Sequence, residues 1–244
     1  MVEAAERRAS TDDEVERLAL ELAGRRAQGE PLQYVIGTAA FRHLELSVGP
    51  GVLVPRPETE VLVERALDRL PQDGAVVDVG TGSGAIALAI RQERPDARVW
   101  ATDDSAEALR YARDNRARLD LDVEILRGSL FEPLPSSMRG DFDVVVSNPP
   151  YVSESETHLV GQDVLDHEPD HAVFGGRDGL SIVTALVGQT LPWLRPGGWL
   201  VCEIGHGQSE AVVELFDRAG FIHSGVHGDL AGWDRIVEGR KPER

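Results

Sequence analysis

The residues best placed to do chemistry form the short stretch SNPPY, Ser147–Tyr151, directly after the apolar run Phe142–Val146. Neither proline can donate to a sheet ladder, and each restricts its own φ and the residue before it, so the strand must stop in a stiff loop. Such a loop can hold the amide of Asn148 and the phenol of Tyr151 in fixed places. An ordinary strand-ending turn with a packed tyrosine is the alternative interpretation.

A second candidate is the glycine-rich turn in VVDVGTGSGAIALAI, with Gly80, Gly82 and Gly84 at G-x-G-x-G spacing between a strand and a helix. Glycines there let the backbone turn tightly and approach a ligand at the helix N-terminus. The spacing differs from the G-x-G-x-x-G of dinucleotide sites. Asp78 precedes the turn, and Asp103 ends the next strand, where a carboxylate can accept both ribose hydroxyls. S-adenosylmethionine, an adenosyl ligand without a pyrophosphate, fits this set, whereas the alternative is a tight turn with two strand-end aspartates.

Alternating strands and helices must position these residues. Short apolar strands separated by amphipathic helices are typical of a parallel sheet covered on both faces, and ligands bind beyond the carboxyl ends of its strands. We therefore predict a doubly wound α/β fold with a mostly parallel seven-stranded sheet and an antiparallel final strand. The expected helices are 58–70, 85–92, 105–119, 180–191 and 208–219, and the expected strands include AVVDVG, RVWATD, VEILRG, FDVVV and GGWLVCEI.

The chain is predicted to have three unequal parts. Residues 1–30 form a short helical segment, with a helix over Thr11–Gln28 that ends before Gly29 and Pro31. Residues 31–57 form a β-hairpin or linker, because 32–54 is strand-like and broken by glycines. Residues 58–244 form the α/β domain.

Composition narrows the functional classes. The 244 residues are 41% hydrophobic and carry a formal charge of −17, which opposes non-specific binding to nucleic acid. No long apolar run or export signal is evident, so we expect no membrane association and a cytoplasmic location. The single cysteine, Cys202, lies in an apolar run and is expected to be a buried strand residue.

Taken together, these motifs resemble the release-factor glutamine N5-methyltransferase family, whose members have the class I, Rossmann-like methyltransferase fold. The resemblance runs in order from about Gly29 to Val237, and PRPETE at Pro55–Glu60 is more discriminating than NPPY, which resembles a loop also found in DNA amino-methyltransferases. The matching pieces are QYVIG, PRPETE, DVGTGSGAIALAI, ATDDSAEAL, SNPPYV, EP, GGRDGL, LRPGG, EIG and DLAGWDR.

The resemblance implies a mechanism for the NPPY loop. A glutamine amide nitrogen is a poor nucleophile, and the side-chain oxygen of Asn148 and the carbonyl of Pro149 would accept hydrogen bonds from it. These acceptors would position the nitrogen and stabilise positive charge that develops on it. Pro150 would keep the loop stiff, and Tyr151 would wall the pocket against the planar amide.

By the same resemblance, PRPETE lines the cofactor entrance, and Thr59 or Glu60 contacts the methionine end. The other interpretation is that PRPETE only begins a helix, and both can hold together. The predicted cofactor-binding residues are Thr59, Glu60, Asp78, Gly80, Thr81, Gly82, Gly84, Asp103, Ser129, Leu130 and Asn148.

The chain also departs from the family. Ser129 stands where an acidic residue commonly approaches the adenine amino group, which leaves more of the adenine binding to Leu130. His43 replaces a usual glycine and Trp233 a usual arginine. The N-terminal segment is shorter than the usual several-helix domain, which weakens the assignment of the protein substrate.

The expected partners are class-1 peptide-chain release factors, methylated on the glutamine of their Gly-Gly-Gln tip by a monomeric or weakly associating enzyme without stable nucleic-acid binding. Three alternatives remain open: methylation of another protein glutamine such as one in a ribosomal protein, amino-methylation of nucleic acid, and a non-catalytic module that binds the cofactor. No metal is expected, because His158, His167 and His171 lack compact zinc spacing and suggest a solvated, substrate-covering loop.

Overall fold

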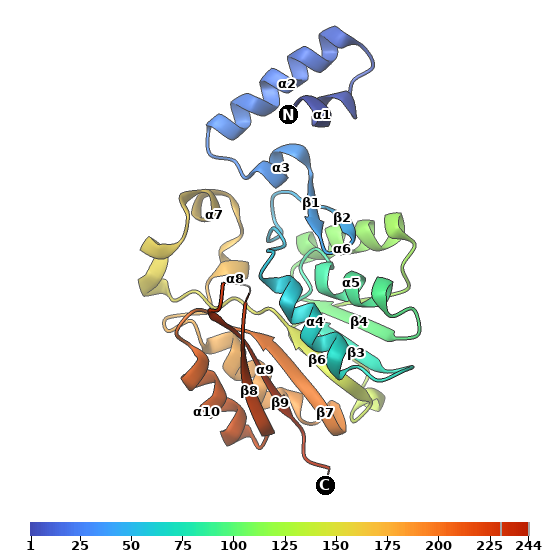
Figure 1. The fold of residues 1–244 in the computed structure, drawn as a ribbon, viewed down its shortest axis with the longest axis vertical. Coiled ribbons are helices and arrows are strands. Elements are labelled where there is room, and N and C mark those ends of the chain that lie inside the picture. Colours follow the sequence, from blue (N-terminus) through green and yellow to red (C-terminus); the bar gives the residue numbers. More distant parts are fainter. Residues whose placement is uncertain (230, 244) are drawn as a thin grey trace.

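A computed structural model describes residues 1–229 and 231–243, in which a seven-stranded sheet has the order β5-β4-β3-β6-β7-β9-β8 (Figure 1). Strands β3 to β7 run parallel, whereas β9 is antiparallel to both β7 and β8. This arrangement confirms the predicted fold class. The strands are β3 (Ala75–Val79), β4 (Arg98–Asp103), β5 (Glu124–Arg127), β6 (Phe142–Ser147), β7 (Leu194–Glu203), β8 (Ile222–Gly228) and β9 (Asp234–Arg240).

Helices cover both faces of the sheet because its central strands are apolar on both sides. Every residue of β3 and β6 is buried, and Val76 faces one apolar cluster while Val77 faces the other. The first cluster packs under α4 and α5, and the second under α9 and α10. The helices are α4 (Thr59–Arg69), α5 (Ala85–Glu93), α6 (Ala106–Leu119), α9 (Ser181–Thr190) and α10 (Ser209–Ala219).

The N-terminal segment contains α1 (Val2–Glu6), α2 (Asp12–Ala27) and α3 (Leu32–Ile36), followed by the hairpin β1 (Thr38–Phe41) and β2 (Leu44–Ser47). The Thr11 side chain accepts a hydrogen bond from the backbone N–H of Glu14, which caps α2 at the predicted start of this helix. Figure 1 shows α1 and α2 standing apart from the sheet, with α3 and the hairpin between them and the sheet.

The strand-like interpretation of residues 32–54 was wrong at its start. Residues 32–36 form helix α3 after Pro31, and Gly37 ends it with φ +82°. The reason is tertiary, because Tyr34 and Val35 are buried on this single turn and the Tyr34 hydroxyl donates to the carbonyl of Val52 at 2.5 Å. The divisions at residues 30 and 57 stay a prediction.

The segment between β6 and α9 contains η2 (Glu154–Leu159), α7 (Gln162–His167) and α8 (Asp170–Val173), and η1 (Ser136–Met138) precedes β6. Within the motif DLAGWDR, Leu230 lies outside the described residues. No helix in residues 1–229 and 231–243 is long and apolar enough to cross a membrane.

Candidate active site

A cavity of about 340 Å³ opens at the carboxyl ends of the parallel strands, where β3 lies between β4 and β6. This is the switch point at which doubly wound sheets bind ligands, and the volume suits a small organic molecule. Its wall brings together segments far apart in the sequence. Among the predicted site residues, those in the wall are Thr59, Gly80, Thr81, Gly82, Asp103, Ser129, Leu130, Asn148, Pro149 and Pro150.

The glycine turn between β3 and α5 has two different functions. Gly80 has φ +76°, and a Cβ added there would meet no heavy atom within 4 Å, so its backbone faces open space. Gly84 instead packs the turn against helices, because a Cβ would lie 2.9 Å from Leu88 Cδ1 and 3.4 Å from Ala112. Gly84 therefore lies outside the cavity wall and allows close packing of the turn.

Asp78 also lies outside the cavity wall, beneath the turn. Its Oδ2 accepts hydrogen bonds from the Thr81 hydroxyl at 2.6 Å and from the backbone N–H of Ala87 at 3.2 Å. Complete burial raises the pKa of Asp78 to about 7. In this position the carboxyl group supports the turn and the start of α5.

Asp103 presents its carboxylate in the cavity wall. Oδ2 accepts a hydrogen bond from the backbone N–H of Gly82 at 2.8 Å, and Oδ1 accepts one from Ser105 at 2.9 Å. Burial raises the pKa of Asp103, although these two hydrogen bonds act to lower it. Because each oxygen keeps a free lone pair, the fixed carboxylate can accept two hydroxyl groups.

Leu130 adopts a left-handed conformation with φ +49° beside Asp103. Its carbonyl accepts a hydrogen bond from the Thr102 hydroxyl at 2.8 Å, which holds the conformation in place. A non-glycine residue held at positive φ is costly and is a feature of ligand sites. Ser129 and Leu130 therefore form a rigid wall section.

The NPPY loop begins where β6 ends, and the Ser147 hydroxyl anchors it by donating to the carbonyl of Val79 at 2.6 Å. Asn148 Nδ2 donates to Thr59 Oγ1 at 3.0 Å, so the amide nitrogen of this side chain already has a partner. Tyr151 lies behind the cavity wall, where its hydroxyl donates to Glu203 Oε1 at 3.3 Å. The loop thus has one face on the cavity and one on a buried carboxylate.

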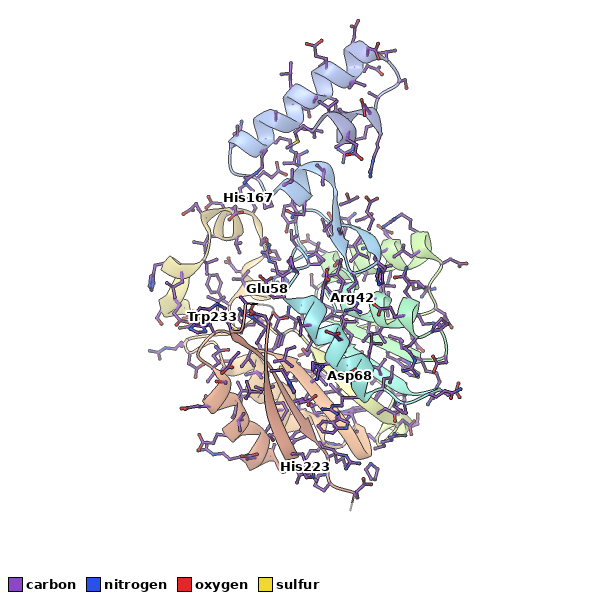
Figure 2. The ribbon with its side chains drawn as sticks, viewed as in Figure 1. Arg42, Glu58, Asp68, His167, His223 and Trp233 are labelled. Carbon is purple, nitrogen blue, oxygen red and sulfur yellow. The ribbon has the colours of Figure 1, made fainter. Side chains whose placement is uncertain are left out.

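Of the two PRPETE residues considered, Thr59 lies in the wall and Glu60 does not. Glu60 Oε1 instead accepts a hydrogen bond from the backbone N–H of Arg42 at 2.9 Å, which links α4 to the β1–β2 hairpin. Figure 2 shows Arg42 on the hairpin side of α4.

Sequence reasoning missed several parts of the wall. His171 belongs to it but was not among the predicted site residues, although its segment was predicted to be a solvated, substrate-covering loop; Arg56 and residues on α9 also belong to it. Arg56 and Glu168 form an ion pair at 2.5 Å that connects PRPETE to the segment after β6. Both segments contain a piece of the family pattern, PRPETE and EP, but their spacing in the sequence does not indicate that the two are in contact. The additional wall residues on α8 and α9 are His171, Ala172, Ile182, Ala185 and Gln189.

His43 and Trp233, which replace a usual glycine and a usual arginine of the family, lie outside the cavity wall. His43 is exposed in the hairpin turn, and Trp233 is 55% exposed with its ring 4.6 Å from that of His206. Figure 2 shows Trp233 and Glu58 at one end of the sheet and His223 at the other. Trp233 is therefore at the end where the cavity opens.

The part of the chain that the structure describes holds no cluster of three or more histidine, cysteine, aspartate or glutamate side chains suited to a metal ion.

Comparisons with known proteins show similarity to methyltransferases. The family model for the methyltransferase small domain matches residues 57–195. The chain is 43% identical over 219 residues to a release factor glutamine methyltransferase of Geobacter sulfurreducens, covering 90% of this chain and 76% of that protein. It is 45% identical over 219 residues to one of Mycolicibacterium smegmatis, covering 88% and 76%. A methyltransferase structure from Pyrococcus furiosus matches with a TM-score of 0.64 and 20% identity over 93% of this chain and 98% of that chain, which supports the fold.

Proposed function

The chain belongs to the release factor glutamine methyltransferase family, and on this premise we propose that it transfers a methyl group from S-adenosylmethionine to the glutamine side chain in the Gly-Gly-Gln motif of peptide-chain release factors. One observation carries the proposal. The amide nitrogen of Asn148 is engaged by Thr59, which leaves its side-chain oxygen as the acceptor for a substrate amide at the cavity.

The cavity residues fit S-adenosylmethionine. The open space over Gly80 admits a ligand close to the backbone, and the fixed carboxylate of Asp103 suits a ribose. Ser129 and Leu130, which line the same cavity, would contact the adenine, and Thr59 would contact the methionine end. When bound, S-adenosylmethionine supplies an electrophilic methyl group, and S-adenosylhomocysteine is the product.

The NPPY loop would bind and orient the glutamine amide that accepts the methyl group. The oxygen of Asn148 and the carbonyl of Pro149 would accept hydrogen bonds from the glutamine amide and orient its nitrogen. Both acceptors would also stabilise positive charge on that nitrogen as the new bond forms. Because the proton can leave after transfer, the reaction needs no strong general base.

We further propose a monomer that acts in the cytoplasm, where release factors work, without a metal and without stable nucleic-acid binding. The charge of −17 supports the last point, since phosphate-backbone binding needs a basic face.

Methyl transfer from labelled S-adenosylmethionine to purified class-1 release factors tests the proposal. We expect labelling of the intact factor, loss of label when the Gly-Gly-Gln glutamine is replaced by alanine, and a mass increase of one methyl group on that glutamine. An unlabelled release factor together with a labelled ribosomal protein or nucleic acid in cell extract would contradict the substrate and keep the chemistry.

Replacing Ser129 by aspartate should tighten cofactor binding, because an acidic side chain there can accept a hydrogen bond from the adenine amino group. A hydrogen bond to a charged group contributes roughly 1.5–3 kcal/mol, so the Kd of S-adenosylhomocysteine should fall by about tenfold or more. Calorimetry measures this change. Ser137→Asp adds the same charge at an exposed position and should leave the Kd unchanged; an unchanged Kd in Ser129→Asp would place the adenine elsewhere.

A further inference from the structure

The NPPY loop is held at both of its ends. At its start, the Ser147 hydroxyl bonds it to β3 at 2.6 Å. At its end, the carbonyl of Tyr151 accepts a hydrogen bond from the side-chain Nε2 of Gln208 at 2.9 Å. Between these two anchors lie Asn148 and two prolines, and a proline has no N–H with which to fix the backbone. The place of the two proposed acceptors in the loop therefore depends on what holds its ends.

Gln208 lies between β7 and α10, and its side-chain amide bridges two backbone groups. Oε1 accepts a hydrogen bond from the N–H of Gly205 at 2.8 Å, while Nε2 donates to the carbonyl of Tyr151. A backbone N–H only donates and a carbonyl only accepts, so the amide has a single orientation that satisfies both partners. The backbone N–H of Gln208 also donates to the carbonyl of Gly205 at 3.2 Å, which fixes the start of the side chain.

Glycines on two segments allow this bridge to form at close range. A Cβ at Gly205 would lie 3.0 Å from Gln208 Oε1 and 3.1 Å from Tyr151 Cδ2. A Cβ at Gly179 would overlap the carbonyl oxygen of Tyr151 and would lie 2.8 Å from Gln208 Nε2. Both glycines therefore leave room for the hydrogen bond between Gln208 and the end of the loop.

The backbone next to this bridge is held by the segment before α9. The N–H of Val152 donates to the carbonyl of Val173 at 3.1 Å, and the N–H of Gly175 donates to the carbonyl of Val152 at 3.0 Å. A Cβ at Gly175 would overlap the carbonyl oxygen of Pro150. The end of the loop is thus packed against this segment and Gln208, while its first three residues, 148–150, line the cavity.

We propose that Gln208 is a positioning residue for methyl transfer: by holding the carbonyl of Tyr151, its side-chain amide fixes the end of the NPPY loop and with it the oxygen of Asn148 and the carbonyl of Pro149. Gln208 lies outside the cavity wall and acts through the loop. The inference deepens the proposed function and rests on it for the nature of the acceptor. Position matters because a displacement of about 1 Å at a reacting group can slow a reaction roughly 100-fold.

Two substitutions at Gln208 separate its two side-chain hydrogen bonds. At neutral pH Gln208→Glu keeps an acceptor for the N–H of Gly205 but has no proton for the carbonyl of Tyr151, whereas Gln208→Ala loses both bonds. We expect kcat for release-factor methylation to fall roughly 10- to 100-fold in both variants. The Kd of S-adenosylhomocysteine and the KM for S-adenosylmethionine should change less than about threefold, because Gln208 lies outside the cavity wall.

Gln72→Glu is the matched control for the added charge. Gln72 is exposed in the turn before β3, at the end of this strand opposite the cavity, and the variant should keep kcat and the Kd. Wild-type kcat in Gln208→Glu, with or without a loss in Gln208→Ala, would overturn the inference, because the bond to Tyr151 would then not matter for transfer. A loss of cofactor affinity as large as the loss of kcat would also overturn it, since Gln208 would then support the whole cavity.

A second readout needs no methyl acceptor. The nitrogen of Val152 belongs to the same peptide group as the carbonyl of Tyr151, so its ¹⁵N resonance reports on the hydrogen bond from Gln208. This resonance and the side-chain amide resonances of Asn148, assigned with Asn148→Asp, should shift in both Gln208 variants and stay in place in Gln72→Glu. Asn148 resonances that stay in place in both Gln208 variants would refute the positioning role. Release factors that the wild type leaves unlabelled would instead refute the proposed function, and the resonances would still decide the role of Gln208.

Discussion

Methyl transfer is expected to fall by at least roughly 100-fold when Asn148 is replaced by alanine, while cofactor affinity changes little. The variant removes the oxygen that would accept the substrate N–H, an interaction that strengthens as positive charge develops on the nitrogen. Its only side-chain hydrogen bond that the structure shows is to Thr59, so the glycine turn and Asp103 keep their contacts. The measurements are kcat for labelled release factor and the Kd of S-adenosylhomocysteine.

Ser155→Ala is a suitable control for this prediction, because Ser155 is exposed farther along the same segment and lies outside the cavity wall. It should keep both kcat and the Kd. Equal loss of transfer and cofactor binding in Asn148→Ala would mean that the loop mainly shapes the cofactor cavity, which would contradict a direct role in orienting the acceptor.

The positions of Gly80, Asp103 and Asn148 could be predicted from sequence because each follows a strand of one parallel sheet. The carboxyl ends of such strands share an edge, so residues that end β3, β4 and β6 must meet there. Local pattern was sufficient because the strands are apolar throughout and the prolines and glycines mark their ends.

Contacts between distant segments could not be predicted in this way. The Tyr34 hydroxyl of the helix at residues 32–36 bonds to Val52, and Glu168, three residues before His171 of the cavity wall, pairs with Arg56 across 112 residues. Glu203 ends β7, and an acidic residue at a strand end gives no sign in the sequence of which loop packs over it. These features follow from tertiary packing, and no periodicity or residue spacing in the sequence indicates them.

The same distinction separates Asp78 from Asp103, although both lie at the carboxyl end of a strand. Asp78 is completely buried and serves the turn through Thr81, whereas Asp103 faces the cavity. Only the three-dimensional placement shows that one carboxylate supports the site from below and that the other can contact a ligand.

Replacing Asp103 by alanine should chiefly weaken cofactor binding. Each ribose hydroxyl that bonds to a carboxylate contributes roughly 1.5–3 kcal/mol, so loss of one such bond should raise the Kd of S-adenosylhomocysteine about 10- to 100-fold, and loss of both should raise it further. The KM for S-adenosylmethionine should rise in parallel. The kcat at saturating cofactor should change much less, because Asp103 ends β4 and the residues that would orient the acceptor follow β6, on the other side of β3.

Asp103 also accepts hydrogen bonds from the backbone N–H groups of Gly82 and Ser105, so a second variant is needed to separate loss of these bonds from loss of the cofactor contact. Asp103→Asn keeps one acceptor oxygen and the shape of the side chain, so it should show a smaller loss of affinity than alanine. Asp122→Ala removes an exposed carboxylate outside the cavity and should leave the Kd unchanged, which separates a local effect from a change in net charge. If kcat fell in Asp103→Ala while the Kd stayed constant, the cofactor would not use this carboxylate, and the assignment of the cavity around Asp103 and Gly80 to the ribose and adenine would have to be abandoned.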